Sequence, residues 1–382
     1  MKATYMFGAG DVRVIDVPDH TIQSSTDALV RIVRACVCGS DLHPYHSMDV
    51  DPDGRSMGHE FIGVVEAIGS DVRTLRVGDF VIAPFAVSCG TCVFCAAGLQ
   101  TSCVRGGFWN DTSLGTAGGQ AEAVRVPLAD GTLVKVPVGE DADDALLDSL
   151  LTLSDVYGTG WHAAVRGGVG EGSVVMVIGD GAVGLLAVLS ARRLGAEQIV
   201  LMGRHQVRTD LGREFGATEV VAERGEEGIA KVRELTGGLG STVVLEAVGH
   251  RPVYDQAVGV VRAGGVISRV GVPQYEDAPV GFGSLFGPNI TLTGGPAAGA
   301  RATSSSCFRQ SWTAPSSRGG CSTGPSASVR RRRATPRWMP ATRSRSRSGR
   351  DHCRFRSRHG HPRPRFWESS WRAISWCCWT TR

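Results

Sequence analysis

The chain has no long apolar run. No stretch approaches the roughly 20 apolar residues that a membrane-spanning helix needs. The N-terminal residues, Met1–Met6, do not begin an apolar secretory signal. A membrane-bound or secreted protein is therefore not expected, and we expect a cytoplasmic one.

Aromatic residues are also scarce, at 7% of the 382 residues, whereas glycine is frequent, with 51. Few large rings and many turn-forming residues suit an α/β protein in which short elements alternate. The length is sufficient for two domains, each with a substantial hydrophobic core.

Lysine is absent from residues 301–382, although arginine is abundant there. This segment holds 19 arginines and two acidic residues, so it carries +17, and the first 300 residues carry −13 of the net charge of +4. The two parts therefore differ in kind. The first has the acidic balance of an ordinary soluble enzyme, and the second is an arginine-rich tail.

Cysteine is sparse in the first 300 residues, where only six occur, and four of these lie close together. Cys89, Cys92 and Cys95 are separated from one another by two intervening residues, and Cys103 follows after seven more. In a chain without a secretory signal, this spacing indicates metal binding rather than disulfides. Four thiolates form a closed tetrahedral zinc site, which fixes a loop and leaves no position open for chemistry. The alternative of four unpaired surface thiols is disfavoured by the spacing.

Residues 1–150 alternate short apolar runs with Gly and Asp turns. Each run is short enough to be a single strand, so the pattern predicts a compact and mostly β domain. The predicted strands include Ala28–Val33, Phe61–Ile68, Asp79–Ala83 and Ala121–Val126.

The pattern changes after about Leu146, where strands begin to alternate with helices. Helices are predicted up to Leu194 and up to Phe215, each followed by a glycine. This alternation predicts a parallel, doubly wound sheet. The predicted strands are Ser173–Ile178, Ile199–Met202, Thr242–Glu246 and Gly265–Val270, with a helix between the last two.

A glycine-rich turn follows the first of these strands. It reads Gly179-Asp180-Gly181-Ala182-Val183-Gly184 and lies between a strand and a helix. A lone G-x-G-x-x-G is weak evidence, but in this context it predicts a dinucleotide site. The backbone N–H groups at the start of the helix then face the pyrophosphate.

The end of the next strand indicates which dinucleotide binds. An NAD site normally has an acidic residue there to hold the ribose 2′-hydroxyl. This chain has Gly203, then Arg204, with Arg208 nearby. Because a guanidinium group can face a 2′-phosphate, NADP is favoured, and changing Gly203 to Asp is expected to shift the preference toward NAD. In the alternative, Arg204 is a solvated surface residue and NAD binds without the acid.

Three further residues with metal-binding side chains lie far apart along the chain. They are Cys38, His59 and Asp155. A thiolate, an imidazole and a carboxylate can hold one zinc ion with its fourth position open, as catalytic sites do. Each residue alone has an ordinary explanation: a small buried cysteine, a surface histidine and a helix N-cap.

Two neighbours of these residues need an interpretation of their own. Glu60 follows His59 and is either a group that supports the histidine or an alternative ligand. Cys36 has the same chemistry as Cys38, and we interpret it as a packing residue.

Residues 1 to about 295 resemble the zinc-dependent, medium-chain alcohol dehydrogenase family. Gly58-His59-Glu60, followed by Gly63, Gly69 and Val72, matches the zinc motif of that family at every spacing. The four-cysteine segment matches its structural zinc loop, and residues 38–43 match its first-ligand segment. The resemblance implies a GroES-like zinc-binding catalytic domain over residues 1–150 and a Rossmann dinucleotide-binding domain over residues 151–295.

The resemblance also implies roles for single residues. Cys38, His59 and Asp155 take the positions of the catalytic zinc ligands, and Asp155 stands where many members have cysteine. Ser40 and His43 match the hydroxyl and the imidazole of the proton relay. The implied cofactors are one catalytic zinc ion, one structural zinc ion and NADP, with NAD as the alternative. The implied nicotinamide contacts are Thr159, Val248, Val270 and Gly271.

The resemblance fails in residues 296–382, which lack helical and strand periodicity. Six of the eight tryptophans lie here, together with the run Arg330–Arg333. One interpretation is a nucleic-acid arm whose arginines contact phosphates, and a second is a disordered tail. The third, which we favour, is translation out of frame, since arginine occurs without lysine. The family implies further strands, a helix and a homo-oligomer, and the tail shows no such elements.

We therefore expect a zinc-dependent oxidoreductase that transfers a hydride between an alcohol, or an aldehyde or ketone, and NADP(H). A small-molecule substrate is expected as its partner, and nucleic acid and membrane are not. The alternatives are an NAD-linked polyol or amino-alcohol dehydrogenase, a nucleic-acid-binding protein and an inactive zinc-stabilised scaffold. The substrate is left open, because the far wall of the cleft is expected in the tail.

Overall fold

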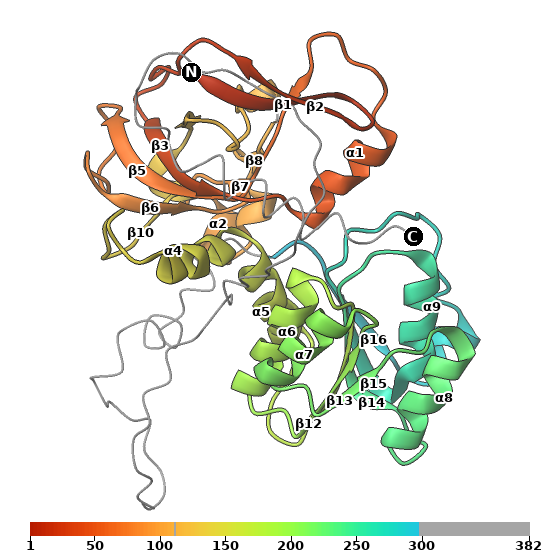
Figure 1. Ribbon diagram of the computed structural model, residues 1–382. Helices are drawn as coiled ribbons and strands as arrows, with labels where there is room; N and C mark the ends of the chain where they lie inside the picture. Colours follow the sequence, from red (N-terminus) through yellow and green to blue (C-terminus); the bar gives the residue numbers. More distant parts are fainter. Residues whose placement is uncertain (111, 298–382) are drawn as a thin grey trace, which may run out of the picture.

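The computed structural model describes residues 1–110 and 112–297 (Figure 1). All but the first two residues of the predicted tail lie outside this range, so its three interpretations stay predictions. The described chain forms two parts, a β-rich one and an α/β one, which meet along α4 and α5. Among the described residues, no helix has the length and apolar character needed to span a membrane.

The β-rich part is built on antiparallel strands. A five-stranded sheet has the order β10-β6-β5-β3-β9, and a three-stranded sheet, β2-β1-β4, and a pair, β7-β8, accompany it. Its strands are β1 (Lys2–Gly8), β2 (Asp11–Asp16), β3 (Ala28–Ala35), β4 (Arg55–Ser56), β5 (Phe61–Ile68), β6 (Phe80–Ala83), β7 (Ala86–Val87), β8 (Gly107–Phe108), β9 (Ala123–Val126) and β10 (Val134–Lys135). Its helices are α1 (Leu42–Ser47), α2 (Val93–Ala96), α3 (Ala129–Thr132) and α4 (Asp144–Leu151).

The core of this part follows from alternation along the strands. In β3, Ala28, Val30 and Ile32 point inward and are buried, and Arg31 points outward to an ion pair with Glu140. Successive side chains of a strand point to opposite faces, so this alternation buries one face of the sheet. The four strands predicted between residues 28 and 126 are confirmed, with shifts of up to two residues at their ends.

The α/β part contains one six-stranded parallel sheet with the order β13-β12-β11-β14-β15-β16. The order reverses between β11 and β14, and parallel sheets bind ligands beside such a switch point, at the carboxyl ends of the strands. The strands are β11 (Val174–Ile178), β12 (Gln198–Met202), β13 (Glu219–Val221), β14 (Ser241–Glu246), β15 (Val261–Arg269) and β16 (Thr291–Gly294).

Helices cover both faces of this sheet (Figure 1). One layer holds α5, α6 and α7, and the opposite layer holds α8 and α9. Because both faces are covered, the central strand β11 is apolar throughout and has four fully buried side chains out of five. The helices are α5 (Val156–Arg166), α6 (Ala182–Arg193), α7 (Gln206–Phe215), α8 (Gly225–Leu235) and α9 (Arg251–Val260), and a π-helical turn spans Phe282–Phe286.

The doubly wound parallel sheet is confirmed, with one boundary wrong. The last predicted strand, Gly265–Val270, begins four residues earlier, at Val261. Val261 pairs with Ser241 of β14, so the strand starts directly after α9. A register irregularity between Ser241 and Val243 accommodates Gly264 and Gly265.

A shared apolar cluster joins the two parts. Ile62 and Ile82 of the five-stranded sheet pack with Leu147 and Leu150 of α4 and with Leu186 of α6. The predicted division at residue 150 falls near the end of α4. This packing fixes where the segment after α4 enters the junction, and that segment carries Asp155.

Candidate active site

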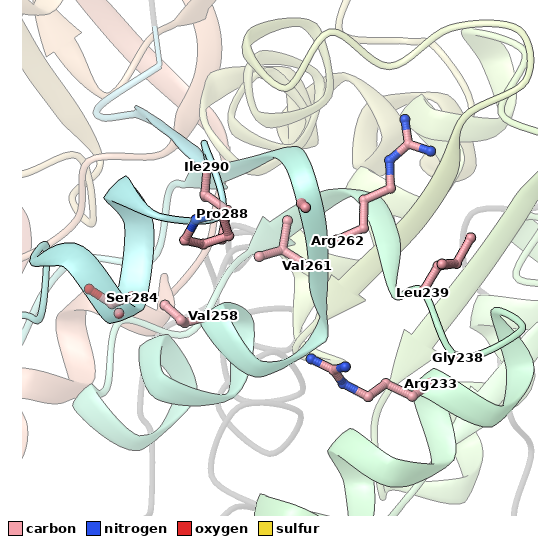
Figure 2. A pocket seen from close by; sticks show the side chains of 11 residues that line it. Arg233, Gly238, Leu239, Val258, Val261, Arg262, Ser284, Pro288 and Ile290 are labelled. Atoms are coloured by element: carbon pink, nitrogen blue, oxygen red, sulfur yellow. The ribbon is translucent and has the colours of Figure 1, made fainter.

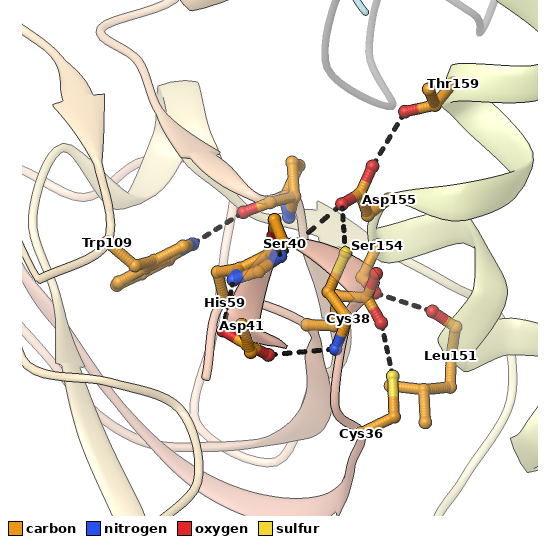
Figure 3. Close-up of polar contacts among 12 residues, drawn as sticks. Cys36, Cys38, Ser40, Asp41, His59, Trp109, Leu151, Ser154, Asp155 and Thr159 are labelled. Atoms are coloured by element: carbon orange, nitrogen blue, oxygen red, sulfur yellow. Dashed lines mark hydrogen bonds and ion pairs between the residues drawn. The ribbon is translucent and has the colours of Figure 1, made fainter. Parts of the chain in front are cut away.

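Three loops bring Cys38, His59 and Asp155 together at the junction of the two parts (Figure 3). Cys38 precedes a turn before α1, His59 precedes β5, and Asp155 lies directly before α5. The Oδ2 atom of Asp155 is 3.7 Å from the sulfur of Cys38 and 3.5 Å from Nε2 of His59. One ligand atom from each of these residues and from Glu60 lies within 4.8 Å of the others.

These distances fit a zinc ion. Zinc bonds of about 2.0 Å to nitrogen or oxygen and about 2.3 Å to sulfur place ligand atoms about 3.3–3.6 Å apart at tetrahedral angles. The measured separations of 3.5 and 3.7 Å are close to these values. Sulfur, nitrogen and oxygen together are a donor set that zinc accepts.

Asp155 occupies the N-cap position of α5 without capping the helix by its side chain. It makes no side-chain cap hydrogen bond, and its Oδ1 instead accepts a hydrogen bond of 2.7 Å from the Thr159 hydroxyl. Its second oxygen is thereby turned toward Cys38 and His59. Asp155 is therefore oriented as a ligand would be, and Thr159, one turn along α5, holds that orientation.

Asp41 also braces this site, although sequence reasoning gave it no role. Its Oδ2 accepts a hydrogen bond of 2.8 Å from the backbone N–H of Cys38, and its Oδ1 lies 3.5 Å from Nδ1 of His59. A carboxylate on the second ring nitrogen orients a ligating histidine. In the sequence, the feature that could have indicated this role is an acidic residue three positions after Cys38 in the first-ligand segment.

Glu60 is only 2% exposed and lies behind the three residues. One of its oxygens accepts a hydrogen bond from the Cys36 thiol, and within the described chain its Oε1 makes no hydrogen bond. A buried carboxylate oxygen without a partner is costly, and a nearby cation relieves that cost. Cys36 packs against the junction cluster, as expected, but also has this specific contact.

Burial and mutual repulsion shift the ionisation of this cluster strongly. Burial and the nearby carboxylates of Glu60 and Asp155 raise the pKa of Cys38 to about 12. Burial and the charge of Asp155 raise the pKa of Glu60 to about 8. Burial lowers the pKa of His59, but hydrogen bonds to Asp155 and Asp41 outweigh it and raise that pKa. Such crowding of acidic groups is relieved by a divalent cation.

Of the two predicted relay residues, Ser40 and His43, Ser40 lies beside the cluster. The Ser40 hydroxyl is 3.5 Å from Nε2 of His59. His43 lies on α1, and burial, followed by the charges of His250 and His46, lowers its pKa. His43 is therefore neutral near pH 7 and is able to accept a proton.

The four closely spaced cysteines form a second group of metal-binding side chains, Cys89, Cys92, Cys95 and Cys103. Their sulfurs are 3.5 Å apart for Cys92 and Cys95, 3.9 Å for Cys92 and Cys103, and 4.0 Å for Cys89 and Cys95. Four sulfurs about 2.3 Å from one zinc ion lie about 3.8 Å apart. Backbone N–H groups of Thr91 and Cys92 point at the Cys89 sulfur, as they do at thiolates. The geometry fits a closed zinc site.

The glycine-rich turn leaves room for a ligand at one glycine. A Cβ on Gly184 would lie 1.9 Å from the carbonyl oxygen of Gly179, so this glycine is required by the fold. Gly181 has an ordinary φ of −76°, and a Cβ there would meet no protein atom within 4 Å. Gly181, Ala182 and Val183 open α6 at the switch point of the sheet. This open cradle fits a pyrophosphate approaching the backbone.

Arg204 and Arg208, the residues predicted to contact the ribose 2′ position, lie against the carboxylate of Asp180, which was not predicted from the sequence. Asp180 accepts hydrogen bonds from the backbone N–H of Arg204 and lies 3.7 Å from the Arg208 guanidinium. A Cβ on Gly203 would lie 2.6 Å from the Cβ of Asp180. The expectation that Gly203→Asp shifts cofactor preference is therefore not a clean test, because any side chain there displaces Asp180. In the sequence, the feature that could have indicated this contact is the acidic residue inside the glycine-rich turn.

The remaining predicted cofactor contacts lie at the ends of β14 and β15. A Cβ on Gly179 would meet Val248 at 2.9 Å, so Val248 flanks the glycine-rich turn. Val270 and Gly271 both donate backbone hydrogen bonds to the Glu246 carbonyl. All three therefore lie beside the switch point, and their contact with nicotinamide stays a prediction.

A cavity of about 590 Å³ lies elsewhere (Figure 2). Val261 at the start of β15 lines it, with Leu239, Arg262 and Pro288, at the amino ends of the strands. The glycine-rich turn lies at the opposite, carboxyl end of the sheet. This cavity therefore belongs to neither the zinc group nor the cofactor cradle.

Removing single ligands separates the two metal groups. We expect Cys38→Ala or His59→Ala to lower the zinc content from about two ions per chain to about one, with a smaller loss of thermal stability than loss of the four-cysteine ion causes. Cys95→Ala also removes one ion but lowers the melting temperature, because that ion fixes a loop. Elemental analysis and thermal melting measure both. Cys36→Ala is the matched control and keeps both ions; Cys38→Ala with undiminished zinc contradicts the site.

Two glycines of the turn are expected to respond differently to alanine. Gly181→Ala keeps the melting temperature and weakens dinucleotide binding, because its methyl group fills open space. Gly184→Ala destabilises the fold, by about 1–3 kcal/mol for overpacking, because the methyl group meets the Gly179 carbonyl. Thermal melting and titration with reduced dinucleotide distinguish the two. Equal affinity for wild type and Gly181→Ala contradicts the cradle.

Comparisons with known families and proteins agree with this geometry. Residues 24–138 match the alcohol dehydrogenase GroES-like domain, and residues 182–312 match the zinc-binding dehydrogenase family. A medium-chain reductase/dehydrogenase of an Acremonium species is 37% identical over 279 residues, which are 71% of this chain and 93% of the relative.

Two further relatives support the same assignment. A probable zinc-binding alcohol dehydrogenase of Mycobacterium tuberculosis is 35% identical over 292 residues, which are 76% of this chain and 73% of the relative. The solved alcohol dehydrogenase of Thermus sp. ATN1 has a TM-score of 0.71 and 35% identity, covering 78% of this chain and 85% of that one. With the two metal groups and the glycine-rich cradle, these matches show that the chain belongs to the zinc-dependent, medium-chain alcohol dehydrogenase family.

Proposed function

We propose that this chain transfers a hydride between a small alcohol, or the corresponding aldehyde or ketone, and NADP(H), with zinc at the junction site. The observation that carries the proposal is the convergence of Cys38, His59 and Asp155 beside the glycine-rich sheet end. A bound zinc ion supplies Lewis acidity and a nicotinamide cofactor supplies the hydride acceptor.

The protein's own residues hold the metal and move the proton. Cys38, His59 and Asp155 are the proposed ligands, and Glu60 is the proposed alternative oxygen ligand beside them. Ser40, next to the His59 ring, takes the substrate proton and passes it toward His43. His43 then releases it to water, since its lowered pKa makes the neutral form prevail near pH 7.

The cofactor proposal rests on charge at the carboxyl end of β12. The segment after β12 carries Arg204 and Arg208, and Arg224 at the start of α8 is near enough to Arg204 and Asp180 for their charges to act on its pKa. Burial lowers that pKa, the charge of Asp180 raises it and the charge of Arg204 lowers it, so Arg224 adds a second cation near Arg204. A 2′-phosphate binds to such cations. NADP is therefore the proposed cofactor, and NAD the alternative.

The nicotinamide end is proposed to lie toward the zinc group. Thr159, Val248, Val270 and Gly271 would line its path, since they lie on α5 and at the ends of β14 and β15. Thr159 connects the two sites, because its hydroxyl already bonds Asp155. A cytoplasmic location and a homo-oligomeric state stay predictions.

The proposal predicts activity with an alcohol and aldehyde panel that depends on zinc. We expect NADP to exceed NAD in kcat/KM by about 10–100-fold, the equivalent of one or two hydrogen bonds to a charged group. Chelator treatment abolishes turnover, and added zinc restores it. Spectrophotometry of the reduced nicotinamide measures each arm.

Each other outcome identifies an alternative. Higher kcat/KM with NAD supports the NAD-linked polyol or amino-alcohol dehydrogenase. Two bound zinc ions with no turnover across the panel indicate an inactive scaffold. Turnover that survives complete zinc removal contradicts the proposal itself.

A further inference from the structure

Asp180 places a buried carboxylate inside the glycine-rich turn. Its side chain is 8% exposed. It reaches across the sheet from the end of β11 to the end of β12. There it occupies the space that a side chain at residue 203 would need, since a Cβ on Gly203 would lie 3.0 Å from its Oδ2.

The carboxylate binds the start of α7 in several ways. Its Oδ2 accepts hydrogen bonds of 2.9 Å from the backbone N–H groups of both Arg204 and His205. The same oxygen lies 2.9 Å from Nδ1 of His205, and Oδ1 lies 3.7 Å from the guanidinium of Arg208. Asp180 thus connects the turn to the segment that carries the cations.

These contacts leave little capacity for another donor. A carboxylate has about four acceptor positions, and protein groups already use most of them. A ribose 2′-hydroxyl, the group that an acid in this region binds in NAD enzymes, would have to compete with them. The two N–H groups of Arg204 and His205 are also taken, so they are not free to bind a phosphate. Among the described residues, the side chains of Arg204, Arg208 and Arg224 are cationic groups at this end of the sheet.

We propose that Asp180 is a positioning residue that sets the preference for the 2′-phosphate by holding residues 204–208 against the glycine-rich turn. The inference rests on the proposed NADP-linked function and deepens it. The negative charge of Asp180 is itself compensated by the adjacent guanidinium of Arg208, so it repels a nearby phosphate only weakly. Losing the anchor weakens the hydrogen bonds from the backbone of Arg204 and His205 and removes the ion pair with Arg208, so the cationic segment moves away from the turn.

The test is a titration of the zinc-loaded full chain with NADPH and with NADH, followed by nicotinamide fluorescence and without substrate. Asp180→Asn keeps the shape of the side chain and removes its charge. We expect the Kd for NADPH to rise about tenfold or more and that for NADH to rise less than about threefold. Asp210→Asn, on the exposed side of α7, removes a charge from the same helix and leaves both values unchanged.

The ratio of the two dissociation constants distinguishes the explanations. Equal weakening of both cofactors shows that Asp180 only caps α7, and tighter NADPH binding shows that it repels the phosphate; either result overturns the proposal. His205→Ala removes one partner of the carboxylate and keeps both backbone bonds, so it serves if Asp180→Asn does not fold. It is expected to lower the NADPH preference in the same direction, and an unchanged ratio overturns the proposal. A wild-type chain that binds NADH as tightly as NADPH contradicts the proposed function instead.

Discussion

The meeting of a thiol, an imidazole and a carboxylate at one buried point is the constraint on which the rest of the structure depends. Cys38, His59 and Asp155 lie within hydrogen-bonding or ion-pairing range, and Glu60 adds a second carboxylate behind them. Without a cation this arrangement is costly, because burial and repulsion raise the pKa of Cys38 to about 12 and that of Glu60 to about 8. Zinc turns the same four groups into a favourable donor set.

Packing far from the metal determines whether the ligands meet. The first two ligands belong to the β-rich part, and Asp155 enters from the segment that begins the α/β part. Leu147 and Leu150 of α4, packed on Ile62 and Ile82, place that segment. A mutation that loosens this apolar cluster therefore displaces a ligand without touching the site. The metal chemistry and the interface between the two parts depend on each other.

Much of the site was predictable, because the proposed zinc ligands and the four-cysteine segment lie in motifs with recognisable spacing. The unpredicted residues act through space instead. Asp41 lies in a turn and contacts Cys38 and His59, and Asp180 lies after one strand and contacts Gly203 after the next. Folding brings these residues together, and no repeating pattern in the sequence indicates either contact. The doubly wound parallel sheet followed from alternating strands and helices, but the start of β15 at Val261 did not. All but the first two residues of the tail, where the substrate wall is expected, lie outside the described residues.

Zinc K-edge X-ray absorption of the purified chain tests the central claim most directly. The account predicts two ion environments in equal amounts, one with four sulfur ligands at about 2.3 Å and one with a single sulfur and nitrogen and oxygen ligands at about 2.0–2.2 Å. Replacing Cys38 should abolish the mixed environment alone. A spectrum described fully by four-sulfur coordination, with no nitrogen or oxygen ligands, would contradict it.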